Sequence, residues 1–229
     1  MKQNIIFFVK YPKKDKVKTR LAKSVDKTLV IELYKCFVAD MLETLETLNA
    51  NTTIFFQPDV SKEKMQTWIG HKYPLFEQKG DDLGERMYHA FHQMFQNGCN
   101  ECIIVGSDTP DLPAAIYQEA FAKLKESDGV IGPAADGGYY LLGLHKRSLD
   151  PSLFQNILWS SEHVFSQTLE KIRQLHYKMN QLPKWEDIDT IENLHNLYHR
   201  NLTTQFYHSK TMQLILSSKF KGALSWKKK

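Results

Sequence analysis

Three cationic side chains that follow the first apolar run of the sequence could bind phosphate groups. Lys10, Lys18 and Arg20 come after residues 5–9, which read Ile-Ile-Phe-Phe-Val. Lysine supplies a compact positive charge, and arginine supplies a bidentate fork for phosphate oxygens. A solvated, lysine-rich loop would have a similar composition, and that interpretation suits Lys13, Lys14 and Lys16. Placement at the end of an expected strand favours phosphate binding for the other three.

Two aspartates in separate segments could hold a metal ion between them. Asp108 follows the apolar run 101–105, and Asp189 lies two residues after Asp187 near the C-terminal end. Carboxylate oxygens and shared phosphate oxygens are the ligands that Mg²⁺ prefers. Each aspartate also has a local alternative, because Asp108 could stabilise a turn and Asp189 or Thr190 could cap a following helix. Asp111 is interpreted as a helix cap.

Two glycine-containing segments could line a ligand site. Asp136, Gly137 and Gly138 form a tight turn with a carboxylate at its edge, where glycine lets the backbone approach a ligand closely. The same residues would suit a plain hairpin turn. The segment Gly-Asp-Asp-Leu-Gly-Glu-Arg-Met at 80–87 offers a similar choice between a nucleotide-contacting loop and a helix start capped by Asp82.

The elements that must position these residues alternate between strands and helices. Apolar runs predict strands at 5–9, 53–56, 101–105, 129–131 and 139–144, and helical spacing predicts helices at 28–48, 61–69, 83–96, 113–126 and 191–198. This alternation indicates an α/β domain with a largely parallel sheet. Ligands bind beyond the carboxyl ends of such strands, so the polar segments are expected to converge there.

Composition narrows the class of protein. A chain of 229 residues with 42% hydrophobic and 24% charged residues is long enough for one globular domain. Its first apolar run is too short for a signal peptide or a membrane span, and three cysteines form no closed set of pairs, so a cytoplasmic protein is expected. The Cys99-x-x-Cys102 pair is interpreted as structural. The missing Walker and G-x-G-x-x-G motifs argue against a P-loop hydrolase and an NAD-dependent dehydrogenase.

The C-terminal end carries the basic excess of the chain. Residues 198–229 contain seven lysines or arginines and no acid, which leaves 23 basic and 26 acidic residues in the remainder. We therefore predict a transferase domain over residues 1–197 and a basic extension over 198–229, whose removal should not abolish chemistry. Nucleic-acid binding is not expected. A solvated helix with a charged end is favoured over membrane contact through an amphipathic anchor at 216–229.

The residues and the order of six motifs resemble those of the bacterial GT-A-like transferases, a largely uncharacterised group of nucleotide-diphospho-sugar transferase relatives. The chain is also similar to 2-phospholactate guanylyltransferase and to the molybdenum cofactor guanylyltransferase. The resemblance covers roughly residues 5–194. The segments that carry it are 8–22, 78–87, 105–113, 132–144, 159–161 and 186–194.

The resemblance implies a nucleotide-diphospho-sugar transferase fold, with a Rossmann-like mixed, mainly parallel sheet flanked by helices. It implies that Lys10, Lys18 and Arg20 bind phosphate, and that Asp108 and Asp189 hold Mg²⁺ or Mn²⁺. The nucleotide pocket it implies also includes Gly80, Asp82, Arg86, Gly137 and Gly138. One departure is Asp15, which stands about where the family usually has glycine. Either this acid turns to solvent or donor binding is altered.

The expected activity is Mg²⁺-dependent glycosyl transfer from a nucleotide-sugar donor to a small-molecule acceptor. Asp108 would be central, Arg20 would neutralise the departing phosphate, and Asp136 would act as base. A nucleotidyltransferase that releases pyrophosphate would use the same phosphate and metal apparatus. A non-catalytic nucleotide-sensing or scaffold domain is the alternative from another class. The sequence decides neither what is transferred nor the oligomeric state.

Overall fold

Seven strands form one mixed sheet in the computed structural model, which describes residues 3–223. The strand order is β3-β2-β1-β4-β6-β5-β7. The bounds are Gln3–Val9 for β1, Ala50–Phe56 for β2, Leu75–Glu77 for β3, Glu101–Val105 for β4, Gly129–Pro133 for β5, Tyr139–His145 for β6 and Met179–Gln181 for β7. Strands β1 to β4 are parallel, and β6 runs antiparallel to its neighbours β4 and β5. The predicted mixed, mainly parallel α/β sheet is confirmed.

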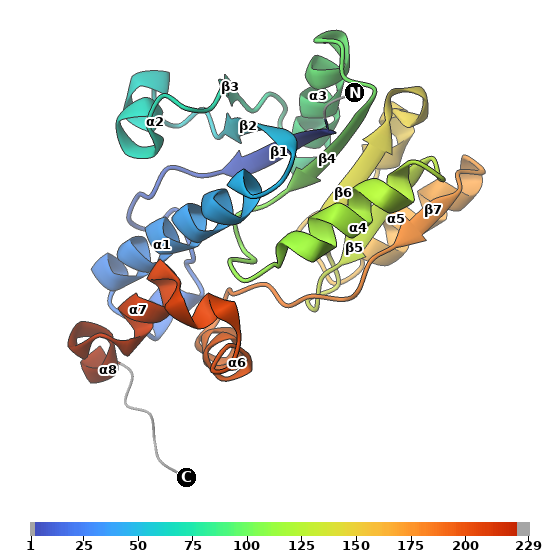
Figure 1. The fold of residues 1–229 in the computed structure, drawn as a ribbon. Coiled ribbons are helices and arrows are strands. Elements are labelled where there is room, and N and C mark those ends of the chain that lie inside the picture. The colour runs from blue at the N-terminus through green and yellow to red at the C-terminus, as the bar shows by residue number, and fades with distance from the viewer. Residues whose placement is uncertain (1–2, 224–229) are drawn as a thin grey trace.

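Helices cover both faces of the sheet (Figure 1). α1, α2 and α4 contribute to the apolar cluster on one face, and α3 and α5 to the cluster on the other. Their bounds are Lys27–Glu46 for α1, Lys62–Ile69 for α2, Leu83–Gln96 for α3, Ala114–Leu124 for α4 and Val164–Gln174 for α5. Strand β1 shows why a continuous apolar run is needed, because Ile5 and Phe7 pack in the first cluster while Ile6 packs in the second.

Local capping sets the starts of several helices as expected. Ser61 accepts a hydrogen bond from the Lys64 backbone N–H at the start of α2, and Asp82 accepts one from the Glu85 N–H at the start of α3. The helix-cap interpretation of Asp111 is wrong. Pro113 is the N-cap of α4 and makes no side-chain cap bond, whereas the Asp111 carboxylate is used in tertiary contacts described below.

Some elements were not predicted. Strands β3 and β7 have three residues each, too few to show a period, and helix α5 buries only Val164, Thr168 and Ile172 on an otherwise polar segment. Cys102 is fully buried in β4, which agrees with a structural role, and the three cysteines of residues 3–223 are free thiols. Within these described residues no helix is both long and apolar enough to cross a membrane.

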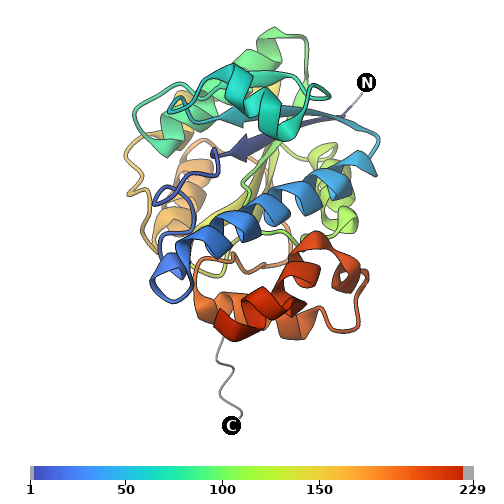
Figure 2. The same cartoon turned by 90° about the vertical axis from the view of Figure 1, so that its left-hand side faces the viewer.

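The C-terminal helices pack against α1 rather than apart from the domain (Figure 2). They are α6 at Ile191–Arg200, α7 at Lys210–Leu216 and α8 at Ser218–Ala223. Met212, Ile215 and Phe220 are buried beside Leu33 and Phe37 of α1. The predicted boundary between residues 197 and 198 falls inside α6. The basic end at 224–229, part of the segment considered for membrane contact, lies outside the described residues.

The order of the strands in the sheet leaves room for a ligand site at the ends of β1 and β4. After β1 the chain builds β2 and β3 on one side, and it then places β4 on the other side of β1. Parallel sheets bind ligands at such a switch point, because the loops that leave the two strands separate there. The loops after β1 and β4 are those that carry Lys10, Lys18, Arg20 and Asp108.

Candidate functional site

A cavity of about 620 Å³ opens at the carboxyl ends of β1 and β4 and beside the turn between β5 and β6. Such a volume suits a nucleotide-sized ligand. Five loop segments of the chain meet around it, together with Tyr34 of α1 and Leu83 of α3. The lining residues that bear on its chemistry are Lys10, Lys16, Lys18, Arg20, Tyr34, Ser107, Asp108, Asp136, Gly138, Tyr139, Trp159, Asp187 and Asp189.

Backbone hydrogen bonds bring the second aspartate segment to the first. The Trp185 N–H donates to the Pro133 carbonyl at the end of β5, at 3.0 Å, and the Ile188 N–H donates to the Asp108 carbonyl, at 2.9 Å. This extended segment buries Ile188 completely in the cluster beside α1. Its alternate residues, Asp187 and Asp189, line the cavity, as expected for two positions in an extended chain.

Lys18 lies between the two aspartates that were predicted to hold a metal. Its Nζ is 2.5 Å from Asp108 Oδ1 and 3.0 Å from Asp189 Oδ1. Burial would lower the pKa of this ammonium, but the two carboxylates reverse the direction and raise it, so Lys18 is charged. Its charge is paired with these two carboxylates in the structure, and direct contact of Lys18 with phosphate stays a prediction.

Of the two residues that could cap the helix after residue 190, Asp189 and Thr190, the structure uses Thr190. Thr190 caps α6, with its hydroxyl accepting from the Asn193 N–H in a capping box. The Asp189 carboxylate is thereby left for Lys18. The Asp108 side chain is 50% exposed and that of Asp189 38% exposed, so both carboxylates open toward the cavity.

Burial and the nearby charges of Asp108 and Asp136 together raise the pKa of Asp187 to about 8, against the opposing effect of the Lys18 ammonium. Four carboxylates, those of Asp108, Asp136, Asp187 and Asp189, line this one cavity, and two of them contact the Lys18 ammonium. One of the four is protonated near neutral pH in the absence of another cation. The site accumulates negative charge that a bound cation would relieve.

This pKa makes the stability of the protein depend on pH. Between about pH 4 and pH 8 the folded state holds a proton on Asp187 that the unfolded state releases, so Asp187 lowers stability increasingly as pH rises through this window. Asp187→Asn, which mimics the protonated form, should therefore stabilise the protein more at pH 9 than at pH 5, by on the order of 2 kcal/mol after solvent screening. Thermal unfolding of both proteins in metal-free buffer measures this, and an equal difference at the two pH values would contradict it.

The remaining cations of the first loop lie at the rim of the cavity. Lys10 and Arg20 are exposed and line it, and Lys10 is close enough to help lower the pKa of Asp108. Asp15 forms a 2.6 Å ion pair with Lys27, and its side chain is 60% exposed. This acid therefore turns to solvent, which was the first of the two expectations for it. Its φ of 62° is in the left-handed region, which explains why glycine would suit this position.

Some residues of the predicted nucleotide pocket make hydrogen bonds within their own segment, residues 80–87. Asp82 caps α3, and the Arg86 guanidinium donates to the carbonyl oxygens of Gly80 and Asp81. Of this segment's described residues, Leu83 lines the cavity, whereas Gly80, Asp82 and Arg86 do not. Ligand contact by these three stays a prediction that the cavity lining does not support.

The two glycines of the hairpin turn differ in what lies next to them. Gly137 has a φ of 93°, and a Cβ there would overlap the carbonyl oxygen of Glu162. Its own carbonyl accepts a hydrogen bond from the Phe165 N–H at 2.8 Å. Gly137 thus makes room for a neighbouring loop, and only Gly138 of the pair lines the cavity. Asp136 Oδ1 accepts from the Gly138 N–H, which fixes its carboxylate at the edge.

Sequence reasoning missed several residues of the cavity wall. The Tyr34 hydroxyl lies 2.9 Å from Ser107 Oγ and accepts a hydrogen bond from the Lys10 N–H, so it joins the ends of β1 and β4. Tyr34 sits in α1 with no signal that separates it from a core residue. Residues 159–161 form one of the motifs behind the family resemblance, but no role was predicted for them. Gly84 is the residue that could have indicated a contact with this loop, because a Cβ at position 84 would overlap the Trp159 side chain.

The donor set fits a divalent cation held jointly with a ligand. Within the described residues no group of three or more His, Cys, Asp or Glu side chains is arranged to hold a metal ion. Mg²⁺ nevertheless needs only one or two protein carboxylates when substrate phosphates complete its coordination. Asp108 and Asp189 supply such a pair, with exposed oxygens beside the cationic rim.

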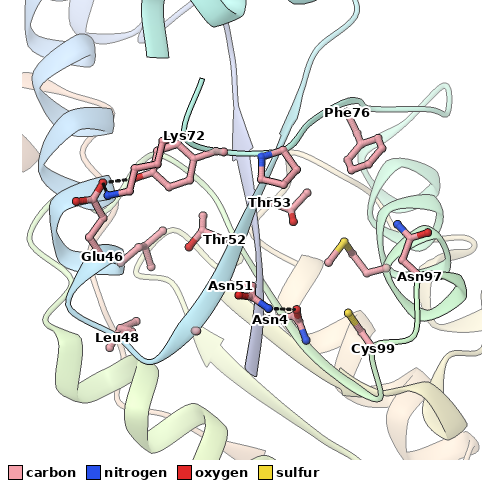
Figure 3. A pocket seen from close by; sticks show the side chains of 15 residues that line it. Asn4, Glu46, Leu48, Asn51, Thr52, Thr53, Lys72, Phe76, Asn97 and Cys99 are labelled. Carbon is pink, nitrogen blue, oxygen red and sulfur yellow. Dashed lines mark hydrogen bonds and ion pairs between the residues drawn. The ribbon is translucent and has the colours of Figure 1, made fainter. Parts of the chain in front are cut away.

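A different cavity, of about 580 Å³, lies near the start of β1 and away from these loops (Figure 3). Amide and hydroxyl side chains such as Asn51 and Thr53 line it, and its ion pair, Lys72 with Glu46, is at its border. Asn51 Nδ2 donates weakly to Asn4 Oδ1, at 3.5 Å. This wall offers no cluster of charged groups of the kind found around Asp108.

Comparisons with known proteins agree with this geometry. The family described as "Uncharacterized protein conserved in bacteria (DUF2064)" matches residues 41–161. A "putative nucleotide-diphospho-sugar transferase" of known structure from Desulfovibrio desulfuricans is 41% identical to this chain. It superposes with a TM-score of 0.91 over 94% of each chain. A search of curated proteins found no match.

Two more distant structures share the fold. A cytidylyltransferase from Leptospira borgpetersenii is 16% identical, with a TM-score of 0.57 over 94% of this chain and 92% of that one. The molybdopterin-guanine dinucleotide biosynthesis protein A of Archaeoglobus fulgidus is 12% identical, with a TM-score of 0.52 over 84% and 95%. The chain belongs to the DUF2064 family of bacterial proteins, and its fold is that of the nucleotide-diphospho-sugar transferases.

Proposed function

We propose that this protein is a glycosyltransferase that takes a sugar from a nucleoside-diphosphate donor, with Mg²⁺ or Mn²⁺ at the Asp108–Asp189 pair. One observation carries the proposal. Two half-exposed carboxylates from distant segments converge at the switch point of the sheet, beside a cationic rim and in one cavity. The likeness to the Desulfovibrio desulfuricans protein supports a nucleotide-sugar donor.

The roles of the residues follow from their positions. Lys10 and Arg20, exposed at the rim, bind the two phosphates of the donor and hold its negative charge close to the carboxylate pair. Asp108 and Asp189 would hold the divalent cation, which when bound neutralises charge on the phosphate oxygens. Arg20 stabilises the nucleoside diphosphate as it leaves, and this contribution is mainly electrostatic.

The acceptor side of the reaction is assigned to the hairpin turn. The acceptor oxygen attacks the anomeric carbon while the bond between that carbon and the phosphate oxygen breaks. Asp136, whose carboxylate is fixed at the edge of the cavity by the Gly138 N–H, takes the proton from the acceptor hydroxyl. No covalent intermediate with the protein is needed.

Product analysis distinguishes this proposal from its nearest alternative. Thermal-shift screening of nucleoside triphosphates and nucleotide sugars with Mg²⁺ comes first, because a ligand at 100 times its Kd stabilises the fold by about 2.7 kcal/mol. Glycosyl transfer is expected to release a nucleoside diphosphate from the best donor. Release of pyrophosphate from a triphosphate would identify a nucleotidyltransferase instead. Mg²⁺-dependent binding without either product would support a sensing domain, and no binding would remove the proposal.

A further inference from the structure

Lys18 differs from every other cation of the first loop in its burial. Its side chain is 2% exposed, whereas Lys10, Lys14, Lys16 and Arg20 are exposed residues. The ammonium also lies 5.7 Å from the centre of the Phe37 ring. A lysine that served to capture phosphate from solution would extend outward, as its neighbours do. Lys18 instead reaches inward to the carboxylate pair.

The backbone of the loop is shaped around this contact. Lys18 has a φ of 47°, in the left-handed region that non-glycine residues rarely adopt. The adjacent Val17 is 3% exposed and packs in the core beneath the sheet, which anchors the loop next to Lys18. Such conformations persist when the surrounding structure holds them, and they cluster at functional sites. The backbone of the loop therefore holds Lys18 next to the carboxylate pair.

The ammonium occupies the oxygens that a metal would use. It contacts Oδ1 of both Asp108 and Asp189, so it neutralises one of the two charges of the pair. A divalent cation at the same pair would lie beside the ammonium and be repelled by it. The remaining carboxylates, Asp136 and Asp187, line the same cavity, but Asp108 and Asp189 are the two that contact the ammonium.

We propose that Lys18 is the resident counter-ion of the Asp108–Asp189 pair and excludes divalent cations until the phosphates of a nucleotide arrive. The phosphates then offer the ammonium another partner and offer the metal its remaining ligands, so that metal and nucleotide bind together. The role given to this exclusion, to couple metal binding to nucleotide binding, rests on the proposed function. The central claim, competition between an ammonium and a metal for two carboxylates, is testable without any nucleotide.

Mn²⁺ titration of the full-length protein, followed by the loss of the free-ion electron paramagnetic resonance signal, tests the claim. Lys18→Met should bind Mn²⁺ at least tenfold more tightly than the wild type in the absence of nucleotide, because the competing charge is gone. Lys18→Gln should show the same gain, and it replaces Lys18→Met if that variant does not fold. Circular dichroism and thermal unfolding establish folding for each protein.

Two matched variants separate competition from a general change of charge. Lys14→Met removes one positive charge from the same loop, away from the cavity, and should bind Mn²⁺ as the wild type does. Lys18→Arg keeps the charge and should also bind weakly. Equal affinity of the wild type and Lys18→Met would overturn the proposal, and so would weaker binding by Lys18→Met, which would make Lys18 an anchor for the carboxylates. A lack of nucleotide turnover would count against the proposed function without changing this result.

Discussion

Replacing Asp108 with asparagine is expected to lower the rate of nucleotide-sugar turnover about a thousandfold or more while the protein stays folded. Asp108 contributes one of the two carboxylates of the proposed metal pair, and loss of a metal's charge stabilisation costs several kcal/mol in the transition state, at about tenfold per 1.4 kcal/mol. Burial alone would raise the pKa of Asp108, but Lys18 and Lys10 lower it overall, so the residue acts as an anion. Steady-state kinetics with the donor found by thermal shift give the measurement.

The structure explains why this substitution should spare the fold. The Asp108 side chain is half exposed, and Lys18 keeps Asp189 as a partner, so no buried charge is left alone. Asp59 provides the matched control, because it too follows a parallel strand, β2, yet does not line the cavity. Asp59→Asn should keep full turnover. Activity of Asp108→Asn within tenfold of the wild type would show that the carboxylate pair is not where catalysis occurs.

Features set by short stretches of the chain were predictable from the sequence. The apolar run of β1 indicated a strand buried on both faces, and Ser61 and Asp82 cap helices through bonds that span three residues. The convergence of the loops after β1 and β4 needed one further rule, that parallel strands gather their following loops at one edge. The edge of the sheet that carries the candidate site was therefore predictable from the sequence. The pairing of Asp189 with Asp108 was predicted from the carboxylate ligands that a metal needs and from the family resemblance, not from this rule.

Features that depend on contacts between distant segments were not predictable in this way. Lys18 was grouped with Lys10 and Arg20 because the sequence shows their charge and spacing, but not which one turns inward. Gly137 was assigned to ligand approach, whereas the backbone it admits is that of Glu162. The pattern around Asp111 suggested a cap, since nothing nearby indicates that Arg200 would reach it.

The contact between Arg200 and Asp111 is expected to be the most costly single interaction to break in this fold. The Asp111 side chain is 1% exposed, and it accepts two bonds from Arg200, at 2.7 and 3.0 Å, besides those from Trp185 and Asn201. Arg200→Met should leave a buried carboxylate unpaired and lower the free energy of unfolding by about 3–5 kcal/mol. Urea denaturation measures the loss. Residues after Tyr198 would then be required for stability, contrary to their predicted role as a removable extension.

Two comparisons make this prediction specific to the buried pair. Arg173→Met breaks an exposed pair with Glu170 on α5 and should change stability by no more than about 0.5 kcal/mol. Adding Asp111→Asn to Arg200→Met should restore part of the lost stability, because the amide is neutral and still accepts from Trp185. If Arg200→Met is no less stable than Arg173→Met, the buried ion pair does not stabilise the fold. Packing of α6 and α7 on α1 would then account for the position of the C-terminal helices.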